Sequence, residues 1–391
     1  MGVALSVFIE AQLTTSVWTD LTSDSFQPAG VAVKYGITGN KPLDAVASTG
    51  VAAVVLQNSA TAAGRLQGYY SPLHANVRAG WTYGIPFQVV FAHGNDSAAA
   101  VTSITRASTT ATVTTTAVHG RATNDYVRIA GATQAEYNGT WKITVTGVST
   151  FTFTVSSAAT TPATGTITFR RAYVKHRGKV RVIDPDPGQY LTQRVAVASY
   201  DGMRDLAETT LRSVALQENQ TEAQLVTAVL DALPSASQPV ARDLDTGVDS
   251  YPYAFDELGS GVSALSVIQD VCDSAYALAF MKGDGTFRFQ SRNTRAIGSS
   301  AYTFTNTMHG LRVPSSLENV YNLVRVTIPK KTISAAATEE LYALPTAASI
   351  AIAPGETVNP WTDYTDPNDR QVKIGGGSVV TVLVGGTHYA A

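Results

Sequence analysis

Short stretches of alternating apolar and polar residues run through the first hundred positions of the chain. Each is bounded by Gly, Asn or Pro, and the clearest are LSVFIEAQL (5–13), AGVAVKYGITG (29–39), GVAAVVLQNS (50–59) and WTYGIPFQVVF (81–91). A period of two places one face of a β-strand in a core and the other in solvent. Short strands at this spacing favour a β-barrel or sandwich over repeated β-α-β units.

Residues 101–169 differ in composition from the rest of the chain, because they are rich in β-branched residues, alternate between apolar and polar positions and are almost free of charge. The stretches ATVTTT, DYVRIAG, GTWKITVTGV, TFTFTVS and GTITF predict a small all-β unit of its own. Within YNGTW, Asn138 and Gly139 stand between apolar flanks. This pair predicts a two-residue type I′ hairpin turn, which needs positive φ at both positions.

Two helices are predicted between residues 216 and 300. QTEAQLVTAVLDALP (220–234) has Thr221 as its N-cap and ends at Pro234, with Leu225, Val229 and Leu233 on one face. The second helix lies in VSALSVIQDVCDSAY (262–276), and its inward residues are Leu265, Ile268, Val271 and Cys272. A hairpin with its turn at Asp284-Gly285 follows, and strands return after about residue 301.

Composition limits the class of protein. The 391 residues are 44% hydrophobic and only 15% charged, which suits several folded domains and not a disordered chain. A net charge of -2 argues against a dedicated phosphate-binding surface. The single cysteine excludes an intrachain disulfide. The apolar runs are too short for a membrane span, and the N-terminal stretch lacks the basic start of a secretory signal. We therefore expect a soluble protein made in a cytoplasm.

Catalytic signatures are missing from the sequence. It contains no His-Glu-x-x-His, Walker or Gly-x-Ser-x-Gly pattern. The histidines occur singly, without metal-ligand spacing, at His74, His93, His119, His176, His309 and His388. We therefore assign no catalytic residue, no cofactor and no metal ion, and expect that the protein is not an enzyme.

Three other features favour structural interpretations. Cys272 lies on the inward face of a predicted helix, where a thiol packs as a small hydrophobe. DLDTG (243–247) resembles the start of a calcium loop, but no Glu follows at the EF-hand distance, so a solvated turn is favoured. DPDPG (184–188) is interpreted as a turn in which proline fixes φ and an aspartate side chain caps the turn.

Aromatic residues near turns indicate a second possible class of function. Rings stand next to turns in GYYSP (68–72), SYPYAF (250–255) and PWTDYTDP (360–367). Exposed rings can stack on sugars, but Tyr and Trp are also enriched at protein interfaces. An interface role is favoured, and a glycan-binding role remains the alternative.

Two long stretches carry a resemblance to a known group of proteins. The first is GRLQGYYSPLHANVRAGWTYGIPFQVVF (64–91) with KHRGKVRVIDPDPGQYLTQRVAVASYDGMRDLAETTL (175–211). The second is YPYAFDELGSGVSALSVIQDVCDSAYALAFMKGDGTFRFQSR (251–292) leading to SLENVYNLVRVTI (316–328). Together, over about residues 35–364, they resemble minor tail proteins, or tail-tip baseplate hub proteins, of long-tailed non-contractile (siphovirus-type) bacteriophages.

The resemblance implies a mainly β, multi-domain protein. It implies a discontinuous N-terminal hub β-barrel at 1–100 and 170–215, an inserted small β domain at 101–169, an α+β domain at 216–300 and a second β domain at 301–391. The inserted unit resembles small β modules of phage structural proteins and is interpreted as decoration in a surface loop, where insertions are tolerated.

The resemblance also implies a function and partners. Hub proteins of this family form a ring that closes the tail tube and surrounds the channel for DNA during genome ejection. We therefore expect a homotrimer in the virion at the phage tail tip, synthesised in the bacterial host cytoplasm. Its partners would be distal tail and tail-tube proteins, the tape-measure protein and tail fibres, without stable nucleic-acid binding. The alternatives are a glycan-binding tail-tip protein and, in a domain appended beyond residue 391, a cell-wall hydrolase.

Overall fold

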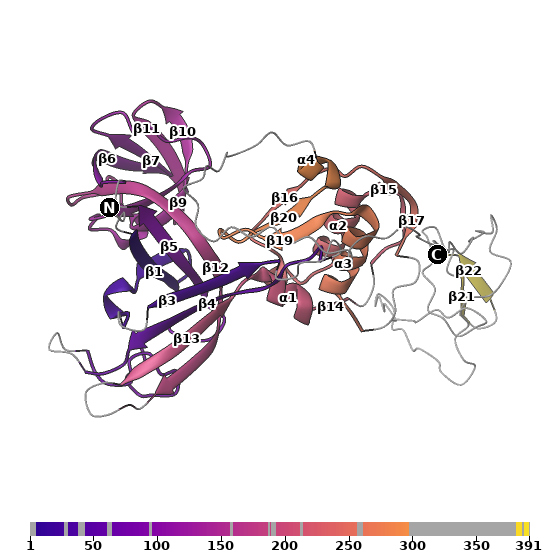
Figure 1. The fold of residues 1–391 in the computed structure, drawn as a ribbon, viewed down its shortest axis with the longest axis horizontal. Helices are drawn as coiled ribbons and strands as arrows, with labels where there is room; N and C mark the ends of the chain where they lie inside the picture. The colour runs from indigo at the N-terminus through magenta and orange to yellow at the C-terminus, as the bar shows by residue number, and fades with distance from the viewer. Residues whose placement is uncertain are drawn as a thin grey trace, which may run out of the picture.

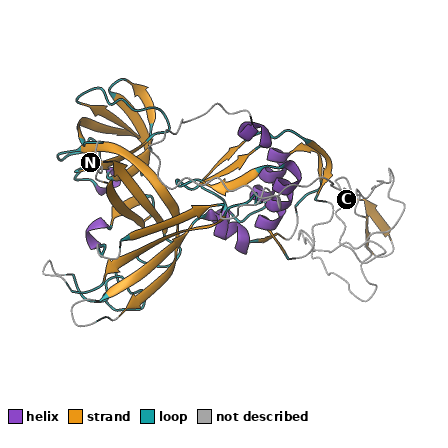
Figure 2. Cartoon of the chain, viewed as in Figure 1, coloured by secondary structure: helices purple, strands orange, loops and turns teal. Residues whose placement is uncertain are grey.

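The structure is a computed structural model that describes residues 5–296 and two short strands near residue 391. Within 5–296 it leaves out residues 27–29, 38–43, 61–64, 94–95, 157–158, 187, 189–192, 212–213 and 256–260. With 48% strand and 16% helix, the expected mainly β class is confirmed. The described part contains three separate clusters of buried hydrophobic residues, which define three units; two β units lie one above the other at the left of Figures 1 and 2, and the helical unit lies to their right.

The first unit, called the sheet unit, is an antiparallel sheet in the order β2-β1-β5-β12-β13-β4-β3. The bounds are β1 Leu5–Thr14, β2 Val17–Asp20, β3 Val31–Gly36, β4 Ser48–Gln57, β5 Pro86–His93, β12 Thr168–Asp186 and β13 Arg194–Tyr200. Alternate residues enter its core, such as Ile9, Val54, Phe87 and Val195. This alternation is the pattern that predicted the strands.

One chain segment bonds to β1 and to β4, the strands next to the two edges of the sheet. The Leu21 N–H donates to the Ile9 carbonyl of β1 at 2.8 Å, and the Phe26 N–H donates to the Val55 carbonyl of β4 at 2.7 Å. The short 3₁₀ turn η1 (Thr22–Asp24) lies between these two contacts. The described strands form no closed ring of pairing, so the expected barrel takes the form of a curled sheet bridged by this segment.

The second unit, called the inserted unit, packs its strands around a core of its own. Its strands are β6 Ala99–Ala107, β7 Thr110–Thr115, β8 Tyr126–Ala130, β9 Gly139–Lys142, β10 Thr144–Gly147 and β11 Thr150–Thr154. Its largest core side chains include Tyr137, Phe151 and Phe169. Strand β12, with 19 residues, pairs with β6 and β8 near its start and with β5 and β13 further on (Figure 1). One strand therefore belongs to both units.

The predicted type I′ turn at Asn138-Gly139 is wrong. Asn138 has φ of -75° and follows the 3₁₀ turn η3 (Ala135–Tyr137), while Gly139 already begins β9. The Asn138 side chain instead holds the backbone of Ala132, accepting from its N–H at 3.0 Å and donating to its carbonyl at 2.7 Å. Gly139 has φ of +114°, and a Cβ there would lie 2.8 Å from Cβ of Trp18. Asn138 therefore fixes a loop within the inserted unit, and Gly139 allows close packing against the sheet unit; the pair forms no hairpin turn.

The third unit, called the helical unit, surrounds α2 and α3. Its elements are α1 Gly202–Glu208, β14 Thr210–Leu211, β15 Gln217–Thr221, α2 Glu222–Asp231, η4 Ser235–Ser237, β16 Ala241–Leu244, β17 Ser250–Ala254, β18 Val262–Ser263, α3 Ala264–Ala275, β19 Leu278–Met281, β20 Thr286–Gln290 and α4 Arg292–Ala296. Strand β20 pairs parallel with β16 and antiparallel with β19.

Both predicted helices are confirmed. Thr221 caps α2 as part of a capping box, in which its backbone N–H donates to the Gln224 side-chain oxygen Oε1 at 2.8 Å. Leu225 and Val229 of α2 are buried, as is Leu233 just beyond its end, while Leu265 of α3 is only half-buried against the same core. The turn at Asp284-Gly285 is also confirmed, because it joins β19 to β20 and Gly285 has φ of +82°.

The predicted turn at DPDPG begins later than expected. Asp184, Pro185 and Asp186 continue strand β12 and pair with Ala196, Val195 and Arg194 of β13. Proline can occupy a strand position whose N–H has no ladder partner. The capping role of aspartate does appear, since Asp186 Oδ1 accepts from the Gly188 N–H at 2.9 Å.

The expected second β domain at 301–391 lies outside the described residues, apart from the hairpin of β21 (Thr381–Val384) and β22 (Thr387–Ala390). Among the helices described, none has the length and apolar character needed to cross a membrane.

Candidate functional site

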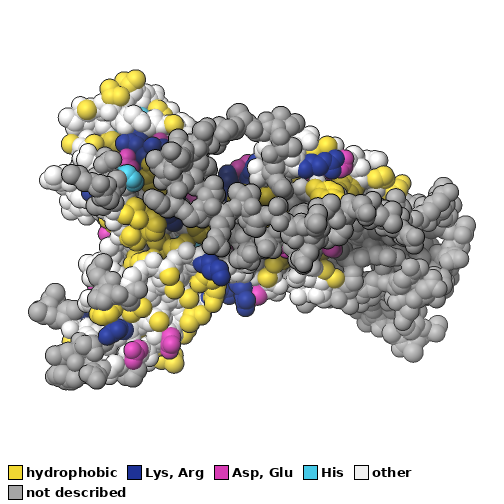
Figure 3. Space-filling view, in the orientation of Figure 1, with side chains coloured by type: hydrophobic (Ala, Val, Ile, Leu, Met, Phe, Trp, Pro, Cys, Tyr) yellow, Lys and Arg dark blue, Asp and Glu magenta, His cyan; other side chains and the backbone are white. Residues whose placement is uncertain are grey.

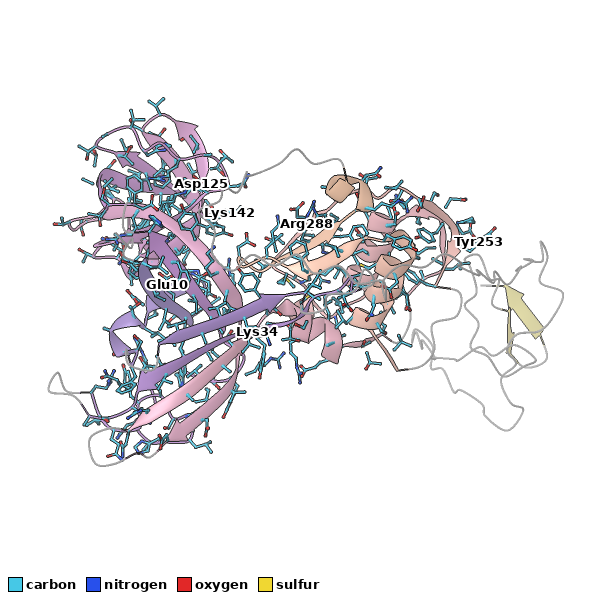
Figure 4. All side chains as sticks on the ribbon, in the orientation of Figure 1. Glu10, Lys34, Asp125, Lys142, Tyr253 and Arg288 are labelled. Carbon is cyan, nitrogen blue, oxygen red and sulfur yellow. The ribbon has the colours of Figure 1, made fainter. Side chains whose placement is uncertain are left out.

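A cluster of buried polar side chains joins the sheet unit to the inserted unit at Glu10 of β1. Glu10 is fully buried (Figure 4). Its Oε2 accepts from Gln88 Nε2 at 2.7 Å, and its Oε1 accepts from Arg128 Nε at 3.1 Å and from Thr140 Oγ1 at 3.2 Å. Burial raises the pKa of the Glu10 carboxyl, and the positive charge of Arg128 opposes that rise. The inserted unit thus supplies the charge that a buried carboxylate requires.

Arg128 of β8 connects further strands of the sheet unit. Its guanidinium also pairs with Asp20 at the end of β2 and lies over the Phe8 ring, with Cζ 4.0 Å from the ring centroid. A guanidinium above an aromatic face gains cation–π attraction, which grows when water is excluded. Only a tenth of the Arg128 side chain is exposed. This one side chain therefore fixes β8 against β1 and β2.

A second polar cluster brings all three units together. Tyr126 of β8 donates its hydroxyl proton to Asp284 Oδ2 at 3.0 Å, and Asp284 lies in the β19–β20 turn. Arg177 of β12 contributes to the same cluster, and burial lowers its pKa while raising that of Tyr126. The turn lies close against β12, because a Cβ at Gly283 would come within 2.5 Å of the Val174 carbonyl oxygen.

A third cluster lies where β13 leads into α1. Asp205 of α1 accepts from Lys179 Nζ at 2.6 Å and from Arg181 at 2.5 Å, both on β12. Asp201 caps α1 through a 3.1 Å hydrogen bond from the Met203 N–H to its Oδ1. Burial raises the pKa of Asp201 to about 7. The helical unit is therefore attached to the strands of the sheet unit through charges as well as through the chain.

His176 is buried between β12 and β13. Its Nε2 lies 3.0 Å from Ser199 Oγ, and both side chains are almost completely excluded from solvent. Burial lowers the pKa of His176 to about 4, so the imidazole is neutral at pH 7. A Ser–His pair without access to solvent serves packing and hydrogen bonding.

The motif at residues 70–80 packs a long loop onto the core of the sheet unit. Tyr70 is fully buried and donates its hydroxyl proton to Asp24, while Arg78 donates to the Tyr70 hydroxyl oxygen at 2.8 Å. Trp81 Nε1 donates to the Tyr70 carbonyl at 2.9 Å. Gly80, with φ of +79°, leaves room for the Leu13 carbonyl. The Tyr70-Ser71-Pro72 turn and the Arg78-Ala79-Gly80 step therefore have structural roles, and Tyr70 is not available to stack on a sugar.

The histidines remain apart in the described residues. His74 accepts from the Asn76 N–H, His93 is exposed, and His119 is buried with Nε2 2.9 Å from the Gly147 carbonyl. His388 lies in β22, and His309 is outside the described residues. In that part of the chain, no three His, Cys, Asp or Glu side chains are placed to hold a metal ion.

The aspartates of DLDTG are partly exposed, as expected, but they form ion pairs, and Asp243 lies in a strand rather than in a turn. Asp243 belongs to β16 and pairs with Lys282 and with Arg288 at 2.8 Å, while Asp245 pairs with Arg288 at 2.7 Å. The hydrogen bond from Lys282 is the main reason that the pKa of Asp243 falls. These carboxylates therefore neutralise neighbouring cations of the helical unit.

Cys272 is fully buried in the core of the helical unit, as predicted. Burial raises its pKa to about 12, so the thiolate form is scarce at pH 7. The side chain acts as a packing group.

Sequence reasoning missed all three clusters between units. Their members are far apart in the chain: 118 residues separate Glu10 from Arg128, and 158 separate Tyr126 from Asp284. The one available signal was Glu10 itself, a charged residue at an inward position of an otherwise apolar strand. Such a residue requires a partner.

The sequence matches no known protein family, and no curated protein matches it. A solved structure with similarity is the 43 kDa tail protein of prophage MuSo2 from Shewanella oneidensis, with 9% identity and a TM-score of 0.38. The match covers 73% of this chain and 53% of that one, so the chain spans about half the length of the tail protein.

Proposed function

We propose that this protein is a structural component of a phage tail, and within it a tail-tip hub protein. One observation carries the proposal: residues in the stretches that resemble hub proteins hold a loop to its sheet and take part in contacts between the units. Tyr70, Arg78 and Trp81 fix the loop that follows β4. Lys179 and Arg181 of β12 pair with Asp205 of α1, and Asp284 joins the helical unit to the inserted unit. Residues with these roles support a rigid building block rather than a reaction.

The proposal includes the assembly and its partners. The protein would form a homotrimeric ring that closes the tail tube and surrounds the ejection channel, in contact with distal tail, tail-tube and tape-measure proteins and with tail fibres. It would act without catalysis. A net charge of -2 supports a channel wall that does not hold DNA, because each phosphate contact would have to be broken during ejection.

The test is to locate the chain in particles. Virions carrying a peptide tag on this protein are imaged by cryo-electron microscopy, with a gold-labelled antibody marking the tag. We expect label at the tail tip and three copies per tail. Absence of the chain from purified virions would contradict the whole proposal, and a single copy or six copies would contradict the trimer.

A glycan-binding role is the second candidate, favoured by an exposed ring in the SYPYAF stretch (250–255). Tyr253 of β17 is 49% exposed at the far end of the helical unit (Figure 4). Exposed aromatic faces can stack on sugars. Saturable binding of the purified protein to host cell-wall polysaccharide, lost in Tyr253→Ala and retained in Leu73→Ala, would support this role.

A further inference from the structure

The outward face of the sheet unit is apolar across four strands. One row of paired residues crosses it, with Ala32 of β3 opposite Ala53 of β4, Ala53 opposite Ala198 of β13, and Ala198 opposite Val182 of β12. Val51, Val55 and Ala196 lie beside this row on the same face, since their strand neighbours Ala52, Val54 and Val197 enter the core. We call these seven residues the outer face.

The outer face is accessible. Ala32, Ala53 and Ala196 are exposed, and Val182 is 41% exposed. Hydrophobic side chains gather over β4 and β13 on this side of the molecule (Figure 3). An antiparallel sheet with one face in water normally carries polar side chains there. A contiguous apolar patch on such a face is typical of a protein-interaction surface.

Two unpaired charges stand at opposite corners of the outer face. Lys34 lies on β3 opposite Val51, at the end near the helical unit (Figure 4), and Asp184 lies on β12 opposite Ala196. Both side chains are exposed, and neither forms an ion pair with any described residue. The face thus has an apolar centre and Lys34 on one flank. The other flank carries Asp184 and, beyond it at the strand ends, Asp186 opposite Arg194, whose guanidinium lies over the Phe26 ring.

We propose that the outer face is the contact between neighbouring copies of this chain, with the Lys34 flank of one copy against the Asp184 flank of the next. The inference rests on the proposed function, since it identifies the surface that would build the ring. A head-to-tail contact needs two different, complementary flanks and generates a closed ring when its rotation closes. The alanines allow close approach, and the charges at the rim fix the order of the flanks.

The first experiment changes the centre of the face. The purified full chain is studied by sedimentation velocity over a wide range of concentrations, and we expect a concentration-dependent trimer. Ala53→Glu places a carboxylate in the apolar centre and should weaken association roughly tenfold or more. Val148→Glu is the matched control, because Val148 is a 74% exposed residue on the inserted unit, and it should leave association unchanged. Circular dichroism verifies that both variants are folded.

The second experiment exchanges the charges at the flanks. Lys34→Glu and Asp184→Lys each place like charges at the contact and should weaken association by several-fold, more at low salt than at high salt. The variant that carries both substitutions restores opposite charges and should associate like the wild type. This rescue distinguishes a contact from a general loss of stability.

Several results would overturn the proposal. One is a chain that stays monomeric at every concentration, and another is association that Ala53→Glu does not change. Association only with isolated tail-tube protein, lost in Ala53→Glu, would assign the face to that protein instead of a second copy. None of these results changes the location of the chain in virions, which tests the proposed function separately.

Discussion

Arg128 offers the sharpest test of how the inserted unit is attached. Arg128→Met removes the guanidinium while keeping an unbranched side chain that can still cover the Phe8 ring. Glu10 would keep its hydrogen bonds from Gln88 and Thr140 but lose its only ion-pair partner among the described residues. The substitution therefore leaves a buried carboxylate without a compensating charge.

The size of the effect follows from the burial of Glu10, whose side chain is 1% exposed. Removing one partner of a buried ion pair costs about 3–5 kcal/mol. The pKa of Glu10 is already raised by burial, and the loss of Arg128 would raise it further. A raised carboxyl pKa gives stability that is present at low pH and lost as pH rises, so the penalty should be larger at pH 8 than at pH 5.

The assay is urea unfolding followed by tryptophan fluorescence at both pH values. Arg204→Ala is the matched control, because Arg204 pairs with Glu208 at 2.6 Å on an exposed helix surface, where such a pair contributes about 0.3–0.5 kcal/mol. Adding Glu10→Gln to Arg128→Met should recover most of the lost stability, since the buried charge is gone. A cost no larger than that of Arg204→Ala, or equal at both pH values, would refute the role of Arg128.

Four further predictions use other parts of the fold. The pKa of His176 is lowered to about 4, so its contribution to stability is complete above pH 6.5 and falls by up to roughly 3 kcal/mol as pH drops to 4; His176→Gln should remove this slope in thermal unfolding. The pKa of Asp201 is raised to about 7, so its contribution to stability is present at low pH and is lost as pH rises through 7. This pH-dependent loss of stability should be missing in Asp201→Asn. Cys272→Ser should cost about 1 kcal/mol or more, and native Cys272 should react with a thiol reagent only on unfolding, which the kinetics of labelling will measure. Replacing residues 101–169 with a Gly-Ser linker should leave a cooperative unfolding transition, because Val90 of β5 still pairs with Val174 of β12, and it should do so better with Glu10→Gln than without.

Local sequence signals were sufficient to predict the elements whose structure depends on residues close together in the chain. Thr221 and Gln224 cap α2 three residues apart, and Gly285 supplies the positive φ that its turn needs. The Asn138-Gly139 pair misled because a distant contact outweighed the local preference: Gly139 packs against Trp18. A turn propensity of this kind is weaker than the packing of two units.

The polar clusters of the candidate site could not be predicted from the sequence for a related reason. Its polar clusters are built from residues on different strands, and each pairing depends on the register of the sheet. Arg128, for example, meets Glu10 only because β8 pairs with β12 and β12 pairs with β5, which lies beside β1. Periodicity predicts which face a residue occupies but not which strand lies opposite.

Strand β12 has a mechanical consequence. Its 19 residues extend over roughly 60 Å at about 3.3 Å per residue and run through two cores without a loop between them. A pull on the inserted unit along the direction of β12 would stretch the hydrogen bonds to β5 and β13 in shear, so that they resist together. A pull across the strands would open the same bonds one after another. The unit is therefore stiff towards force along one axis and easily peeled along the other.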